Sequence, residues 1–223
     1  LLVAEENVDG LLPAPRIALL DAGTGALKGA LTVPSQGGPR TLAALPACAL
    51  AFDANQSGLS GAWYEAATSG QGLMLEIFRD LAAAGTGRAQ VSWFTFDTTA
   101  GGADRQRWYT LAGDVPTGPS AALTIYRNVG GNFAAPPITA AEPVGTATLR
   151  FADCTNAELA YTFADGTART GTIPLTRLTQ NVTCIAGGAA PVDADFAHSG
   201  NWFDPATSGQ GITVEVVRGS RPP

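Results

Sequence analysis

The segment SGAWYEAATSGQGLMLEIFR, residues 60–79, occurs a second time in the chain as SGNWFDPATSGQGITVEVVR, residues 199–218. The identical pairs, all at one constant spacing, include Trp63 with Trp202, Gln71 with Gln210, Glu76 with Glu215 and Arg79 with Arg218. A chain that repeats a segment is built from repeated structural units. Each copy joins an aromatic stretch to an apolar one through TSGQG. This pattern indicates a β-hairpin, since glycine tolerates the positive φ of a tight reversal.

Composition narrows the class of protein. The 223 residues are 45% hydrophobic and 14% charged, which is enough apolar material for a packed core. A net charge of −6 argues against nucleic acid as a partner, because that binding depends on Lys and Arg neutralising phosphates. No run reaches the ~18 apolar residues of a membrane-spanning helix. The first residues lack the pattern of a signal peptide, so we expect either that one was removed or that the chain is part of a longer protein.

Period-2 alternation predicts an all-β fold. Leu149 and Phe151 alternate with Thr148 and Arg150, and no segment keeps a helical period. The predicted strands cover residues 61–67, 73–81, 89–98, 106–113, 122–127, 146–152, 158–163 and 172–178. Eight strands with mostly short connections favour an antiparallel up-and-down β-barrel, because closure leaves no exposed sheet edge.

We expect three parts along the chain. Residues 1–48 hold a hairpin within 16–34 and a linker, or the end of a preceding unit, and residues 1–14 show no periodicity. Residues 55–184 form a complete barrel repeat. Residues 195–223 carry the first hairpin of a second, truncated repeat, which needs a partner because two strands cannot enclose a core. That hairpin could pack on the 16–34 hairpin, exchange strands with another copy through residues 199–218, or belong to a barrel that is not part of this chain.

The three cysteines favour one disulfide. Cys48 and Cys184 each precede a copy of the hairpin, and Cys154 ends a predicted strand. We expect Cys154 to pair with Cys184, which leaves Cys48 for a partner outside this unit. Cys48 with Cys154 is the alternative, as are three unpaired buried cysteines. A disulfide would place the protein in an oxidising, extracytoplasmic compartment. No metal site is expected, since no CxxC pair is present and His198 is the only histidine.

Two resemblances follow from these motifs. Gly61-Ala62-Trp63 together with Arg177 in PLTRL is similar to the signature of the lipocalin and avidin (calycin) class, in which a first-strand Trp packs beneath an Arg of the closing strand. The motif SGxW(Y/F)(E/D)xxxSGQG, followed by WFTFD, RWYTLAG, VGTATLRF and PLTRL, resembles an uncharacterised repeat domain of secreted proteobacterial proteins. That resemblance implies secretion and tandem repetition. It supplies no catalytic residues.

The sequence offers little for catalysis. Serines are present, but no histidine precedes residue 198, so a catalytic triad has no base. Glu65 and Glu76, which recur as Asp204 and Glu215, could form the carboxylate pair of a glycosidase. An ion pair with Arg79, Arg107 or Arg150 would explain their recurrence equally well. We predict no catalytic residue and no cofactor.

Binding residues are predicted at the barrel mouth near TSGQG. Aromatic faces beside carboxylates and amides suit sugars or protein partners, which selects Trp93, Trp108 and Tyr109 with Glu65, Gln71 and Glu76. The competing interpretation is that these aromatics pack inside strands. The Gln71 amide could cap its own turn or reach a neighbouring unit or ligand. Trp63 and Arg177 are expected to be structural.

These patterns favour a secreted, non-enzymatic binding or adhesion module within a repeat-containing protein, with a glycan or protein as ligand. An inhibitor or accessory domain of a secreted protease is a second hypothesis. A fragment of a carbohydrate-active enzyme is a third.

Overall fold

The computed structural model describes residues 2–5, 16–20, 27–32, 52–138, 140–179, 184–185, 198–207 and 209–216. The chain divides into two compact units, Leu1–Cys48 and Ala49–Pro223. The first unit is a three-stranded antiparallel sheet of β1 (Leu2–Glu5), β2 (Arg16–Leu20) and β3 (Leu27–Thr32), in that order. The hairpin expected within residues 16–34 is therefore confirmed. β1, which pairs with β2, lies in a segment without hydrophobic periodicity and was not predicted.

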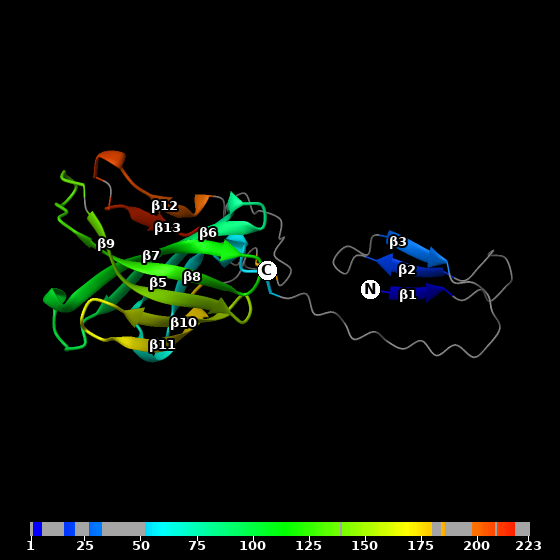
Figure 1. Ribbon diagram of the computed structural model, residues 1–223, viewed down its shortest axis with the longest axis horizontal. Helices are drawn as coiled ribbons and strands as arrows, with labels where there is room; N and C mark the ends of the chain where they lie inside the picture. Colours follow the sequence, from blue (N-terminus) through cyan, green and yellow to red (C-terminus); the bar gives the residue numbers. More distant parts are fainter. Residues whose placement is uncertain are drawn as a thin grey trace, which may run out of the picture. The chain divides into compact units, whose positions relative to one another are not determined.

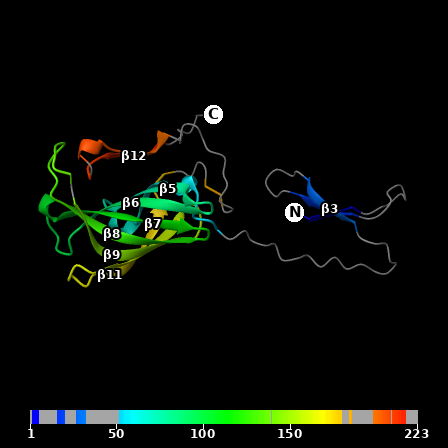
Figure 2. The same ribbon diagram turned by 45° about the horizontal axis from the view of Figure 1, so that its top comes forward.

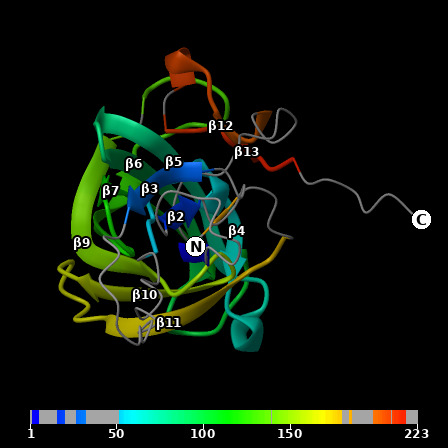
Figure 3. The ribbon, with the colours of Figure 1, turned by 90° about the vertical axis from the view of Figure 1, so that its right-hand side faces the viewer.

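The second unit contains eight strands in one antiparallel, up-and-down sheet that closes into a ring (Figures 1 and 3). Every strand pairs with its neighbour in sequence, and β11 returns to pair with β4. The strands are β4 (Gly61–Tyr64), β5 (Gly72–Ala83), β6 (Thr86–Phe96), β7 (Gln106–Pro116), β8 (Ser120–Val129), β9 (Ala140–Phe151), β10 (Asn156–Phe163) and β11 (Thr170–Arg177). The all-β, eight-stranded expectation is confirmed.

Strand ends differ from the expectation where short 3-10 helices or longer hairpins intervene. β4 ends at Tyr64, because η2 (Ala66–Thr68) begins the TSGQG reversal. β9 begins at Ala140, six residues before the first predicted one, so it pairs with the whole length of β8. The other 3-10 helices of the ring are η1 (Ser57–Leu59) and η3 (Ala103–Arg105).

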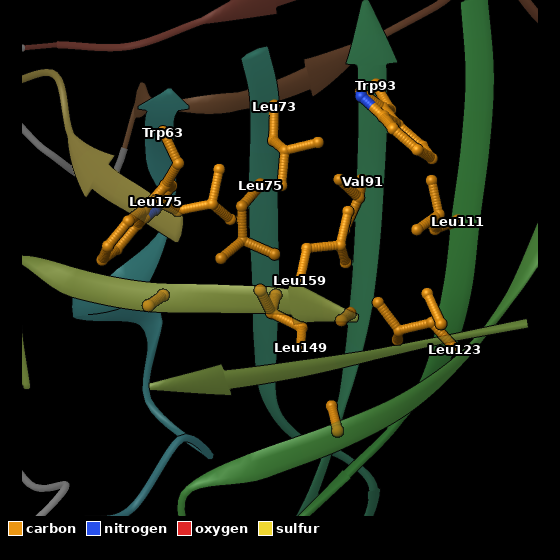
Figure 4. Close-up of a cluster of buried hydrophobic side chains, with 14 of the residues drawn as sticks. Trp63, Leu73, Leu75, Val91, Trp93, Leu111, Leu123, Leu149, Leu159 and Leu175 are labelled. Carbon is orange, nitrogen blue, oxygen red and sulfur yellow. The ribbon is translucent and has the colours of Figure 1, made fainter. Parts of the chain in front are cut away.

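Alternating apolar side chains fill the ring (Figure 4). Leu73 and Leu75 of β5 and Val91 of β6 point into the same interior as Leu149 and Leu159. Every residue of this core lies between Ala54 and Cys184. Because the ring supplies its own core and closes its own sheet, it does not depend on the strands that follow it in the chain.

One disulfide fastens the end of the ring. Cys154 and Cys184 are bonded, with their Cα atoms 5.7 Å apart. The expected pairing is confirmed, and Cys48–Cys154 is wrong. Asp153 orders the same corner by accepting hydrogen bonds from the backbone N–H groups of Thr155 and Asn156. Burial raises the pKa of Asp153, but these bonds and the side-chain bonds from both residues lower it to about 2. Cys48 lies outside the described residues.

The second copy of the hairpin consists of β12 (Gly200–Trp202), η5 (Pro205–Thr207) and β13 (Ile212–Val214). Within the described residues, β12 and β13 pair only with each other. Figures 2 and 3 show this terminal hairpin outside the ring, and hydrogen bonds tie it to β4 and β5. The sequence pattern did not predict that the terminal hairpin would pack on the ring of the same chain.

Candidate functional site

Trp63 and Arg177 close one end of the ring. The Trp63 side chain is 1% exposed and its Nε1 donates to the Leu59 carbonyl at 3.0 Å. The Arg177 guanidinium lies 5.8 Å from the centre of the indole ring and donates to the carbonyls of Gly58 and Ser60, at 2.6 Å each. Burial lowers the pKa of Arg177, and the nearby Glu215 carboxylate opposes that shift. Both side chains hold the ring together and leave no open surface for a ligand.

Trp93 and Tyr109 lie inside the ring and pack in an aromatic cluster with Tyr161 and Phe163. Arg169 covers this cluster, with its guanidinium 4.0 Å from the centre of the Phe163 ring and a hydrogen bond to the Tyr109 hydroxyl at 3.0 Å. Both predicted aromatics are almost completely buried. They pack inside the ring and offer no exposed face to a ligand in this structure, as the competing packing interpretation expects.

Glu65 and Gln71 lie at the predicted mouth, which is closed. The Gln71 amide oxygen accepts a hydrogen bond from Thr95 Oγ1 at 2.7 Å, and Glu65 accepts one from Thr68 Oγ1 at 3.2 Å. The space that they line with Trp93 has a volume of about 30 Å³. This volume suits a single water molecule and excludes a sugar ring.

Glu76 lies on the outer surface of the ring, away from that mouth. Its Oε2 accepts hydrogen bonds from the backbone N–H of Asn201 at 2.9 Å and from Asn201 Nδ2 at 2.6 Å. Burial raises the pKa of Glu76, and the two bonds from Asn201 oppose the rise. Within the described residues, Glu76 is bonded by Asn201 and not by Arg79, Arg107 or Arg150, whereas its counterpart Glu215 lies 3.9 Å from the Arg177 guanidinium. Since Glu65 faces the mouth, the two carboxylates line different surfaces, and a glycosidase pair is not formed.

Trp108 also lies outside, beside an aromatic that sequence reasoning missed. The rings of Phe94 and Trp108 stack with centroids 6.3 Å apart and an angle of 14° between their planes. They stay 47% and 41% exposed. The signal was present in WFTF: β-strand side chains alternate, so Phe94 must face outward if Trp93 faces inward.

Phe94 and Trp108 form the floor of a groove between the outer face of β5–β7 and the terminal hairpin, which we call the outer groove. Its volume is about 1010 Å³. Its lining includes Gln90, Phe94, Trp108 and Asn128 from the ring, and Phe203 and Gln210 from the hairpin. Gln210 fixes the hairpin wall, because its amide donates to the Asn132 carbonyl at 2.6 Å and accepts from the Ala134 N–H at 2.8 Å. The Gln210 amide of the second repeat copy therefore reaches the ring that the first copy belongs to.

Comparison with models of protein families, with curated proteins and with solved structures finds no match for this chain. The described part of the chain holds no group of three or more His, Cys, Asp or Glu side chains that could bind a metal ion. None of the helices described is long and apolar enough to span a membrane.

Proposed function

We propose that this protein is a non-catalytic binding module that holds a glycan in the outer groove. The observation that carries the proposal is the exposed, nearly parallel pair Phe94 and Trp108. Large aromatics left on a surface mark interaction sites, and their flat faces accept the C–H face of a sugar ring. The amides of Gln90 and Asn128 line the same groove and would bond sugar hydroxyls.

The placement of the acidic groups supports binding over turnover. A glycosidase needs two carboxylates on either side of one bond. Here the Glu76 carboxylate is engaged by Asn201, and Glu65 lies at the closed mouth. Neither carboxylate lines the outer groove. Its described lining presents aromatic faces, amides, hydroxyls and aliphatic side chains, with Arg88 as a charged group.

We also propose that the protein is secreted and that the ring is a calycin-type barrel in a tandem array. The Cys154–Cys184 disulfide supports an extracytoplasmic location, because cytoplasmic thiols are kept reduced. The contact of Arg177 with Trp63 supports the calycin resemblance. The recurring hairpin supports membership of the secreted repeat domain, and in such an array the outer groove of this chain would serve adhesion.

The test is glycan-array screening of the complete chain, followed by calorimetry on the best ligand. Trp108→Ala is expected to weaken binding at least about tenfold, which is about 1.4 kcal/mol. Phe133→Ala is the matched control, because Phe133 is an exposed aromatic that does not line the groove. A blank array with folded protein, or equal affinity in the Trp108 variant, would contradict the proposal.

A further inference from the structure

We propose that the outer face around Gly61, Ala62 and Glu76 is a docking site for the same face of another copy of the repeat, so that two rings pair about a two-fold axis. The evidence is a reciprocal pair of hydrogen bonds. Glu76 accepts from the N–H of Asn201 at 2.9 Å, and Glu215 accepts from the N–H of Ala62 at 3.0 Å. Ala62 and Asn201 are equivalent positions of the two copies, as are Glu76 and Glu215.

The glycines beside these donors show the same reciprocity. A Cβ on Gly61 would collide with Oε1 of Glu215, and a Cβ on Gly200 would collide with Oε1 of Glu76. Both glycines have positive φ, 133° and 147°. Each copy therefore presents a bare backbone surface to the carboxylate of the other. A side chain at either glycine would push the facing carboxylate away and would strain a backbone held at positive φ, which disfavours the contact.

Reciprocity of this kind defines a two-fold contact. In an isologous interface, residue i of one unit contacts residue j of the other, and j of the first contacts i of the second. A hairpin that covered the ring by nonspecific apolar packing would not place both recurring glutamates on equivalent backbone groups. The hairpin docks here as one half of a symmetric pair of repeats.

The ring already contains the complete socket for a second ring. Beside the N–H of Ala62, Glu215 accepts a hydrogen bond from Thr179 Oγ1 at 2.5 Å and lies 3.9 Å from the guanidinium of Arg177. In a pair of identical rings, Glu76 of the second copy would occupy the place of Glu215 and meet these groups. Of the two bonds that Glu76 of the first ring accepts, only the one from the Asn201 side chain would be lost, since Ala62 holds that position.

The inward-type side chains of the terminal hairpin support a ring as the partner. Trp202, Ile212 and Val214 are exposed, and the first two also line the edge of the outer groove. Their counterparts in the first copy, Trp63, Leu73 and Leu75, are buried in the interior of the ring. The hairpin thus docks by its outward side and leaves its inward side for the remaining strands of a second ring.

The test uses the complete chain with Gly200→Val, which blocks docking from the hairpin side and leaves the ring face intact. We expect faster hydrogen exchange in residues 200–214, and a doubling of mass in sedimentation under conditions where the unaltered chain is monomeric. Gly200→Val with Glu76→Ala is expected to return to a monomer. Gly200→Val with Glu142→Ala is the matched control and should stay dimeric, because Glu142 pairs with Arg127 elsewhere on the ring.

Four results would overturn the proposal. In Gly200→Val, the amides of the hairpin could show fast hydrogen exchange while the sedimentation mass stays that of a monomer. The hairpin could remain protected in Gly200→Val, which would mean that the close approach of Gly200 and Glu76 does not govern docking. The dimer could persist without Glu76. The unaltered chain could already be a dimer, which would place its contact on another surface.

Discussion

The two hairpins that begin at Ser60 and Ser199 share one local structure in two different surroundings. Their registers are equivalent: Trp63 pairs with Leu73 in β4–β5, and Trp202 pairs with Ile212 in β12–β13. Trp63 is 1% exposed, whereas Trp202 is 58% exposed. The geometry of the hairpin is therefore encoded within its own twenty residues. Burial of its tryptophan comes from the six other strands of the ring.

The same division appears in polar contacts. Ser60 Oγ accepts from the N–H of Ile77 at 2.9 Å, and Ser199 Oγ accepts from the N–H of Val216 at 2.8 Å, so this bond is local. Gln71 instead bonds Thr95 of its own ring, while Gln210 bonds the backbone at Asn132 and Ala134. Ser60 and Ser199 contact their own hairpins and keep one role in both copies, whereas Gln71 and Gln210 reach beyond their hairpins to different partners.

Replacing each tryptophan by alanine should give the largest contrast. Trp63→Ala removes a buried indole and its bond to Leu59, and we expect a loss of about 3 to 5 kcal/mol in the free energy of unfolding. Trp202→Ala removes an exposed side chain and should cost less than about 0.5 kcal/mol. Urea unfolding followed by circular dichroism measures both. Similar losses in the two variants would mean that the copies are buried alike in solution.

The serine pair should give the next largest contrast. Ser60→Ala leaves the N–H of Ile77 without a partner inside the ring, which costs about 1 to 3 kcal/mol. Ser199→Ala frees an N–H that water can reach, so global stability should change by less than about 0.5 kcal/mol. Only hydrogen exchange at Val216 and in the adjoining β13 should rise. A larger loss for Ser199→Ala than for Ser60→Ala would reverse the comparison.

Most of the fold could be predicted because its signals are local. Alternation in LRF and LEIF marks a strand, and TSGQG marks a reversal, without knowledge of any other segment. β1 was missed because LVAE is too short for its alternation to stand out. The start of β9 was missed because Pro143 argues against a strand interior, and the register shift opposite Tyr126 accommodates it.

The candidate site was predicted less well, because it depends on which face each side chain takes and on what covers that face. Trp93 and Trp108 were grouped as aromatics, yet the first points into the ring and the second outward. Glu76 was expected to meet a ligand or an arginine. Its actual partner, Asn201, is distant in sequence and belongs to a contact between repeat copies. No pattern within one strand carries that information.

Replacing Gln71 and Gln210 should give a smaller contrast. The first change should affect the stability of the ring, and the second should affect how firmly the terminal hairpin is held on it. Gln210→Ala removes two exposed bonds to the loop at Asn132 and Ala134, so we expect faster hydrogen exchange in β12 and β13 and a change of less than about 0.5 kcal/mol in ring stability. Gln71→Ala removes a half-buried bond to Thr95 and should cost about 1 kcal/mol of ring stability. Unchanged exchange in the first variant would show that Gln210 does not hold the hairpin.

The smallest expected effect is a pH dependence that arises where the two copies meet. The pKa of Glu76 lies above its ordinary value of 4.5, chiefly because burial disfavours the charged carboxylate. Below pH 4.5 the group is protonated in both the folded and the unfolded chain. As the pH rises above 4.5, the unfolded chain loses this proton first, so the free energy of unfolding falls until the folded group also ionises.

The variant Glu76→Gln tests this, because its side-chain oxygen can still accept a hydrogen bond from Asn201 but the amide does not titrate. Urea unfolding between pH 4 and 7 should therefore show the unaltered chain losing stability relative to the variant by less than about 1 kcal/mol, since the group is half-buried. Parallel curves, or a relative gain on raising the pH, would show that the hairpin does not desolvate Glu76 in solution.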